Sequence, residues 1–318
     1  MNKVCIFGAG AVGGHMAAHL ARAGVDVSVV ARGDHLAAIR RDGLRFIGLD
    51  GEFTVRVAAS DHPADLGPQD LVISTLKAHG LPPAASSMRA LLGAGTPVVF
   101  AVNGIPWWYL ATLNGGSPAS RLDPEGTLAR EVGLARALGC VIRSPNEVVA
   151  PGVVRSNSRT SSFLVGEPDG ALSPRLEQAV ALLRRGLPGA APTRDIGREV
   201  WGKLLLNVPS SLLSSLTHSP SSALFADAAT RELYARLARE TCAVAARHGA
   251  AMAFDLDGQM AATGSNLHPP SMLQDLLAGR PLELDAQLFA VQDLARSAGV
   301  DTPMLDVMLA LLAHRARA

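Results

Sequence analysis

The pattern of apolar and polar residues changes character once along the chain. Before about residue 166, short apolar runs alternate with glycine-containing turns and helical stretches. Short apolar runs bounded by turn residues are typical of buried strands. After Leu176, apolar residues recur at helical spacing in long segments rich in Ala and Leu. The pattern therefore predicts an α/β protein, with an N-terminal Rossmann-type parallel-sheet domain followed by an all-α C-terminal domain.

The pattern also predicts individual elements. The predicted strands are Lys3–Phe7, Val25–Val30, Phe53–Ala58, Leu71–Thr75, Pro97–Val102, Gly139–Val149, Val153–Ser156 and Ser162–Val165. The predicted helices are Val12–Ala23, Ala84–Leu92, Thr127–Leu138, Pro174–Arg185, Ile196–Leu216, Ala226–His248, Pro270–Leu277, Glu283–Ala298 and Met304–Ala316. Pro209 is expected to kink its helix. Leu187–Asp195 reads as the connector, which gives a first domain of residues 1–190 and a second of 191–318.

Composition narrows the classes of function. The net charge of +1 over 318 residues gives no reason to expect a nucleic-acid partner or an acidic membrane surface. No uncharged apolar run reaches about 18 residues, and no signal peptide is visible, so we expect no membrane span. Cys5, Cys140 and Cys242 lie far apart, as expected for buried, reduced thiols in a cytoplasmic protein. The nine His residues show no metal-ligand spacing, so we expect no metal.

The first fifty residues carry the strongest motif. The run is Gly8-Ala9-Gly10-Ala11-Val12-Gly13, which lies between a predicted strand and a predicted helix. In this context the first glycine allows a tight turn, the second lets a pyrophosphate approach the backbone, and the third allows close packing of helix on strand. The start of the helix offers free N–H groups to the phosphates. We therefore expect these six residues to bind a dinucleotide.

The end of the second strand indicates which dinucleotide. Proteins that prefer NAD usually place Asp or Glu there to bind the ribose hydroxyls, but this chain has Ala31 and Arg32. The planar fork of an arginine suits a 2′-phosphate, which favours NADP. Two alternatives stay open: Arg32 is a solvated loop charge, or the nearby Asp34 serves NAD.

Later motifs suggest a reaction. In chain order they are Ser74-Thr75-Leu76-Lys77-Ala78, Ala101-Val102-Asn103-Gly104-Ile105, Trp201-Gly202-Lys203-Leu204-Leu205-Leu206-Asn207, Ser271-Met272-Leu273-Gln274-Asp275 and Gly279-Arg280-Pro281-Leu282-Glu283-Leu284-Asp285. Together they resemble the ketopantoate reductase family, from the N-terminus to about residue 312. The resemblance implies an NADP-binding Rossmann domain, a helical domain and an active site in the cleft between them. It also implies NADPH-dependent reduction of a 2-keto acid, 2-dehydropantoate, to pantoate.

The resemblance assigns roles to residues in the second half. Lys203 would protonate the keto oxygen, and Asn207, one helical turn later, would bind a substrate hydroxyl or carbonyl. Ser271 would hold the substrate carboxylate, and Glu283 would reach the cofactor ribose or Lys203. The structural alternatives are an exposed charge for Lys203, a helix-packing hydrogen bond for Asn207, a helix cap or first-turn residue for Ser271, and a surface residue for Glu283.

Two further residues lie at the carboxyl ends of predicted strands, where open α/β sheets bind ligands. They are Lys77 and Asn103. The family places both near the cofactor, and Asn103 near the substrate as well.

The chain departs from the family pattern at three places. Ser211, which we expect to bind the substrate with a shorter side chain and a single donor, stands where many members have a second Asn. Ala286-Gln287-Leu288-Phe289 stands where Asn-Gly is frequent. Trp107-Trp108-Tyr109 is bulky for a loop; it lines a substrate pocket or packs in a core. The substrate therefore stays open between ketopantoate, another 2-keto acid and an opine-type substrate. A non-catalytic NADP sensor and a homodimer also stay open.

Overall fold

The computed structural model describes residues 1–113, 115, 120–263 and 269–317. Within it the chain folds into two compact units, Met1–Ile196 and Gly197–Ala318. The division lies shortly after the boundary expected at residue 190. In the described part of the chain, no helix is long and apolar enough to cross a membrane, and no group of three or more His, Cys, Asp or Glu could hold a metal ion.

The first unit is built on an eight-stranded sheet. Its strands, in spatial order, are β12 (Ala190–Pro192), β11 (Ser162–Gly166), β8 (Ala137–Arg143), β7 (Val98–Ala101), β6 (Leu71–Ser74), β1 (Lys3–Phe7), β2 (Asp26–Val30) and β5 (Ala58–Ser60). All neighbours pair in parallel except β8 and β11. The chain steps from β1 to β2 in one direction and from β6 to β7 in the other. The strand order therefore reverses beside β1, and ligands bind at such a point in open α/β sheets.

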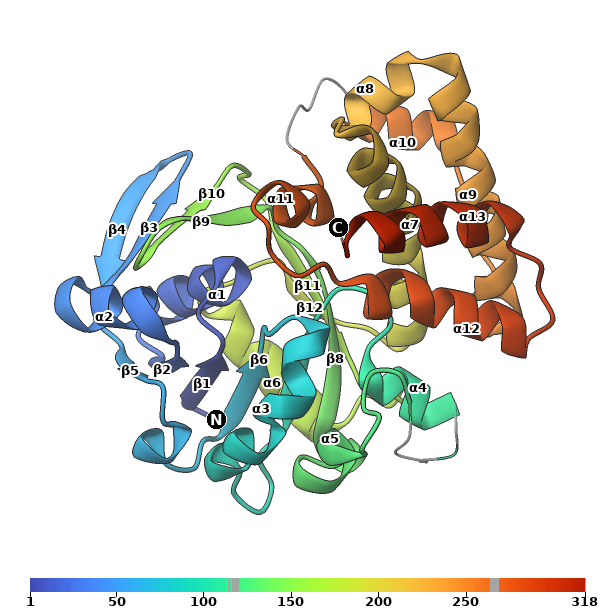
Figure 1. Ribbon diagram of the computed structural model, residues 1–318. Helices are drawn as coiled ribbons and strands as arrows, with labels where there is room; N and C mark the ends of the chain where they lie inside the picture. The colour runs from blue at the N-terminus through green and yellow to red at the C-terminus, as the bar shows by residue number, and fades with distance from the viewer. Residues whose placement is uncertain (114, 116–119, 264–268, 318) are drawn as a thin grey trace. The chain divides into compact units, whose positions relative to one another are not determined.

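A smaller sheet, six α-helices and four short 3-10 helices (Pro63–Leu66, Ala78–Gly80, Arg89–Leu91 and Leu134–Arg136) make up the rest of the described part of the first unit (Figure 1). The small sheet has the order β4 (Gly51–Val55), β3 (Leu44–Gly48), β10 (Val153–Ser156) and β9 (Asn146–Ala150). The helices are α1 (Ala11–Arg22), α2 (Gly33–Asp42), α3 (Leu81–Met88), α4 (Trp107–Leu113), α5 (Thr127–Glu131) and α6 (Pro174–Arg184). Residues of α1, α6 and the small sheet belong to one buried apolar cluster that includes Met16, Val154 and Leu176. That packing fixes α1 over the parallel strands.

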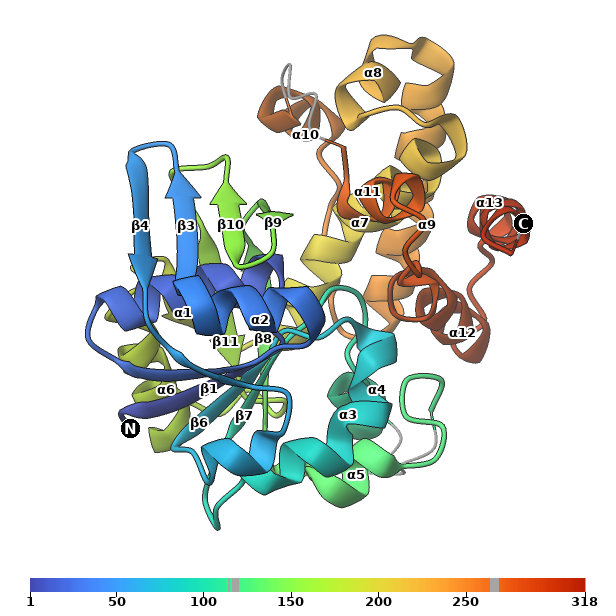
Figure 2. The same ribbon diagram turned by 60° about the vertical axis from the view of Figure 1, so that its left-hand side comes forward.

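The second unit is all-helical within the described residues (Figure 2). Its elements are α7 (Ile196–Thr217, whose first residue ends the first unit), α8 (Ser221–Ala226), α9 (Ala228–Arg247), α10 (Leu256–Thr263), α11 (Ser271–Leu277), a π-helical turn (Asp285–Phe289), α12 (Ala290–Ser297) and α13 (Pro303–Arg315). The α9 helix packs against α8, α12 and α13. Its Glu240 accepts hydrogen bonds of 2.9 Å from the backbone N–H groups of Met304 and Leu305, which anchors the start of α13.

Several predicted elements were wrong in extent, for local reasons. The strand expected at Gly139–Val149 is interrupted at Ser144 and Pro145, giving the separate strands β8 and β9. The helix expected at Thr127–Leu138 ends at Glu131 because Gly133 adopts a φ of +86°, and β8 follows from Ala137.

Other boundaries also moved. The segment Phe53–Ala58, expected to form one strand, is divided between the end of β4 and the start of β5. The helix expected from Ala226 begins at Ala228, since Asp227 caps it through a 2.8 Å bond from the Thr230 N–H. The α7 helix runs unbroken through Pro209.

Several features were missed or misread, and β12, α8 and α10 are among the elements without a prediction. The segment from Gly33 to Gly48, α2 followed by β3, carried no prediction. Trp107, expected in a loop, begins α4, and Trp107 and Trp108 are 2% and 1% exposed. The Trp107 and Phe100 rings pack edge to face, with centroids 5.4 Å apart. Core packing is therefore the correct interpretation of this aromatic run.

Candidate active site

The glycine turn joins β1 to α1, and its three glycines have different surroundings. Gly8 has a φ of +105°, a conformation that favours glycine. A Cβ on Gly13 would lie 2.0 Å from the Gly8 carbonyl oxygen and 2.4 Å from Thr75 Oγ1, so no side chain fits there. A Cβ on Gly10 would meet no atom within 4 Å. Gly10 therefore leaves open space outside the turn, whereas Gly13 closes the turn from within.

The start of α1 suits an anion. The N-cap of α1 is Gly10, no side chain caps the helix, and its first turn contains no acidic residue. The N–H groups of the first turn therefore lack a side-chain acceptor within the described residues, and they lie beside the open space at Gly10. This arrangement fits the pyrophosphate of a dinucleotide.

Two side chains that sequence reasoning missed hold this turn in place. The Thr75 hydroxyl, just after β6, donates to the Gly8 carbonyl. His35 of α2 accepts the Gly152 N–H at Nδ1 (3.0 Å) and lies 2.8 Å from the Ala9 carbonyl oxygen through Nε2. Since Nδ1 is the acceptor, Nε2 carries the proton and donates to Ala9. His35 thereby ties the glycine turn to α2 and to the turn between β9 and β10.

The remaining candidates of the first unit gather along one edge of the sheet. Asn103 follows β7, Lys77 follows β6, the glycine turn follows β1, and Arg32 follows β2. These four strands are consecutive in the sheet. Arg32 is exposed, and its side chain makes no hydrogen bond or ion pair within the described residues. The structure thus brings the predicted cofactor residues of the first unit to the carboxyl ends of adjacent parallel strands.

In the second unit, Lys203 and Asn207 lie one turn apart on α7. Both are half-buried, and they share a half-buried stripe with Gly202, Leu206 and Ser210. The opposite side of the helix is buried and includes Trp201, Leu204 and Val208. Lys203 therefore projects from the less buried side of an apolar helix, as a proton donor to a ligand must.

Ser211, Gln287 and Glu283 form a buried hydrogen-bonded series. The Ser211 hydroxyl donates to Gln287 Oε1, and Gln287 Nε2 donates to Glu283 Oε2, each over 3.4 Å. The three side chains are 3%, 1% and 7% exposed, respectively. Glu283 is therefore not the surface residue of the structural alternative.

Ser271 is the first residue of α11 and is exposed. The N-cap is Pro270, so Ser271 is a first-turn residue and not the cap. Asp275 of the same helix binds Arg280 Nε through Oδ1 at 2.8 Å, and the Arg280 N–H donates to the Asp275 carbonyl. These contacts fix the segment that leads from α11 to Glu283.

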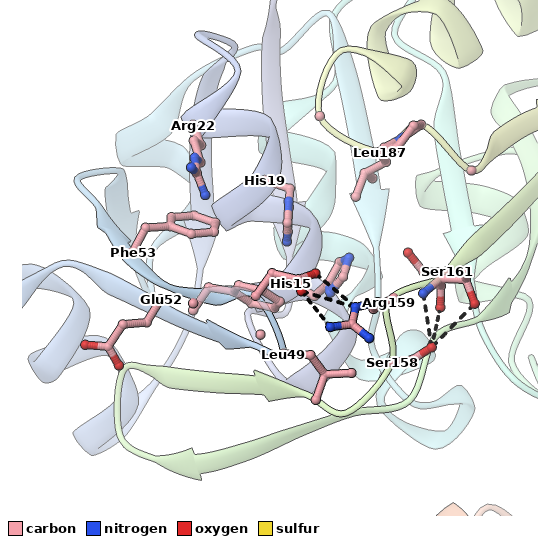
Figure 3. Close-up of a pocket in the computed structure, with 18 residues that line it drawn as sticks. His15, His19, Arg22, Leu49, Glu52, Phe53, Ser158, Arg159, Ser161 and Leu187 are labelled. Carbon is pink, nitrogen blue, oxygen red and sulfur yellow. Dashed lines mark hydrogen bonds and ion pairs between the residues drawn. The ribbon is translucent and has the colours of Figure 1, made fainter.

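A separate cavity of about 540 Å³ lies in the first unit, between α1, the β3–β4 hairpin and the loops at 158–161 and 186–189 (Figure 3). His15 and His19 contribute to its wall, but His15 Nδ1 and His19 Nε2 are closed to solvent and have no partner among the described residues. Burial lowers the pKa of His15 to about 4, so its ring is neutral at neutral pH. A ligand in this cavity could not reach those two nitrogens.

Comparisons with known proteins agree over the whole chain. The family described as "Ketopantoate reductase PanE/ApbA" matches residues 4–169, and "Ketopantoate reductase PanE/ApbA C terminal" matches residues 195–316. The 2-dehydropantoate 2-reductase of Mesorhizobium japonicum is 41% identical over 317 residues, covering 98% of this chain and 96% of the relative.

Solved structures with a similar fold include members of the same family. A crystal structure from Ralstonia solanacearum MolK2, assigned to the ketopantoate reductases, superimposes with a TM-score of 0.92 at 35% identity, covering 99% of this chain and 98% of that one. The 2-dehydropantoate 2-reductase of Geobacter metallireducens GS-15 gives 0.86 at 27% identity, covering 98% and 99%. A D-mandelate dehydrogenase gives 0.84 at 20% identity, covering 99% and 98%, which shows a shared fold alone.

Proposed function

The chain belongs to the ketopantoate reductase family, and we propose that it reduces 2-dehydropantoate to pantoate with NADPH. The observation that carries the proposal is the identity with a 2-dehydropantoate 2-reductase over nearly the full length of both chains. The glycine turn with its uncapped helix start supports the cofactor part of the proposal.

The residues of the first unit are proposed to bind the cofactor, which supplies a hydride when bound. The open space at Gly10 and the first-turn N–H groups of α1 receive the pyrophosphate. The exposed Arg32 guanidinium pairs with the 2′-phosphate. Lys77 and Asn103, at the ends of the neighbouring strands, contact the rest of the cofactor.

The residues of the second unit are proposed to bind and protonate the substrate. Reduction of a ketone needs a proton on oxygen as well as a hydride on carbon, and the Lys203 ammonium donates that proton. Asn207, one turn away on the same stripe of α7, donates its amide hydrogen bond to the substrate. The exposed hydroxyl of Ser271 binds the substrate carboxylate.

The proposal is tested by measuring loss of nicotinamide absorbance with a panel of 2-keto acids. The panel contains 2-dehydropantoate, its analogue without the hydroxyl (3,3-dimethyl-2-oxobutanoate), pyruvate and phenylglyoxylate. We expect the highest kcat/KM for 2-dehydropantoate, and Lys203→Met serves as the inactive control. A higher kcat/KM for another keto acid would reject 2-dehydropantoate as the preferred substrate. If NADPH is oxidised with none of the keto acids, the proposed reductase activity is rejected.

A further inference from the structure

We infer that Gln287 is a positioning residue for the reaction, and that it acts by holding the Glu283 carboxylate. The inference rests on the proposed function. It concerns a residue that lies just where the chain departs from the family pattern. Its evidence is the hydrogen-bonded series from Ser211 through Gln287 to Glu283.

The chemistry of the three side chains fixes the direction of these hydrogen bonds. An ionised carboxylate only accepts, so the Gln287 group that faces Glu283 must be the NH₂ group at Nε2. The Gln287 carbonyl Oε1 then faces Ser211 and accepts the serine hydroxyl. The Ser211 proton is therefore committed to Gln287, and Ser211 can only accept from any further group.

Both Gln287 and Glu283 are buried, so the loss of the hydrogen bond between them should have a measurable effect. Gln287 is 1% exposed and Glu283 is 7% exposed, so little water is available to replace a lost donor. A buried carboxylate that loses a donor keeps the cost of its desolvation and loses part of what offsets that cost. The amide of Gln287 thus contributes to the orientation of the buried Glu283 carboxylate.

The backbone reinforces the same contact. Gln287 lies in the middle of the π-helical turn Asp285–Phe289, and its N–H donates to the Glu283 carbonyl over 3.1 Å. Glu283 is therefore held by Gln287 through both main chain and side chain. Single π-helical turns inside α-helices are frequent at functional sites.

The two departures from the family pattern are coupled by this contact. Ser211 stands where many members have an asparagine, and its hydroxyl bonds Gln287, which belongs to the segment that replaces Asn-Gly. A longer side chain at position 211 would meet the Gln287 amide. The short Ser211 and the long Gln287 thus fit each other, and together they support Glu283 from α7.

The test is a double-mutant cycle on the full-length protein, read as kcat/KM with NADPH and 2-dehydropantoate. Gln287→Leu keeps the approximate volume and removes both hydrogen bonds. We expect about a tenfold loss of kcat/KM, the low end for a hydrogen bond to a charged group, because the distance is 3.4 Å. In a Glu283→Gln background the same substitution should cost less than about twofold.

A structural role alone predicts a different result. If Gln287 only maintained packing, its substitution would lower kcat/KM by the same factor in both backgrounds, and this additivity would overturn the inference. Ser211→Ala gives a second cycle that removes a single hydroxyl, in case Gln287→Leu does not fold. We expect it to cost about threefold in the native background and nothing in the Glu283→Gln background; an equal loss in both would also contradict the inference.

Gln292→Leu is the matched control. Gln292 is likewise a buried glutamine, 7% exposed, and it donates to Asp306 from α12. Its substitution should lower the thermal midpoint without changing kcat/KM. An equal kinetic loss in this control would show that any buried glutamine here has the same effect and would refute the inference, whereas an inactive wild-type protein would refute the proposed function itself.

Discussion

Alanine at Gly13 and alanine at Gly10 should damage this protein in different ways. A Cβ at Gly13 would lie 2.0 Å from the backbone oxygen of Gly8, so the turn must move by more than an ångström to restore contact distance. Overpacking of this kind costs about 1–3 kcal/mol. At about 2–4 °C per kcal/mol, the thermal midpoint of Gly13→Ala should fall by about 2–12 °C.

Gly10→Ala should leave the fold intact and weaken the binding of NADPH. No atom lies within 4 Å of its added Cβ, and the backbone angles of −66° and −157° suit any residue. Its thermal midpoint should stay within about 3 °C of the native value. A methyl group there would keep the pyrophosphate from the helix start, so the Kd for NADPH should rise about tenfold or more, a loss of about 1.4 kcal/mol.

Differential scanning fluorimetry and a titration of NADPH fluorescence measure the two effects separately. Native NADPH affinity in Gly10→Ala would show that the pyrophosphate does not lie at Gly10. An unchanged thermal midpoint in Gly13→Ala would show that the packing argument is wrong.

Three other substitutions test other parts of the account. Lys203→Met should lower kcat by about 10²–10⁴-fold while the Kd for NADPH changes less than about twofold, and native turnover would remove Lys203 from the mechanism. Arg32→Ala should raise the KM for NADPH about tenfold and leave that for NADH unchanged; equal losses would end its assignment to the 2′-phosphate. Burial lowers the pKa of His15 to about 4, so the unfolded chain binds more protons between pH 6.5 and pH 4, and this part of the stability is lost as the pH falls. His15→Asn should therefore flatten urea-derived stability across that window by up to about 1.4 kcal/mol per pH unit, and an unchanged slope would argue against a buried neutral ring.

The parts of the site that sequence predicted are those with local signals. The glycines of the turn are contiguous in sequence, and the strand before them and the helix after them lie in the same short segment. The dinucleotide-binding role of the turn could therefore be predicted from that segment alone. Lys203 and Asn207 share a side of α7 because residues four apart do so in any helix. Lys77 and Asn103 were placed by a rule of topology, since adjacent parallel strands end at the same edge.

The missed residues depend on contacts between distant segments. His35 bonds Gly152, 117 residues away, and Ser211 bonds Gln287, 76 residues away. Neither pairing has a periodic signal in the sequence. A lone His in an unpredicted helix and a Gln in an apolar segment look like surface or core residues until the fold brings their partners to them.

Transfer of deuterium from the cofactor to the product shows whether this protein reduces 2-dehydropantoate by hydride transfer. The protein is incubated with 2-dehydropantoate and NADPH that carries deuterium at the transferable position of the nicotinamide, and the product is examined by mass spectrometry and proton NMR. We expect pantoate with one deuterium at C2, formed in equal amount to the NADP⁺ produced. Unlabelled pantoate, or NADPH that remains unoxidised, would contradict it.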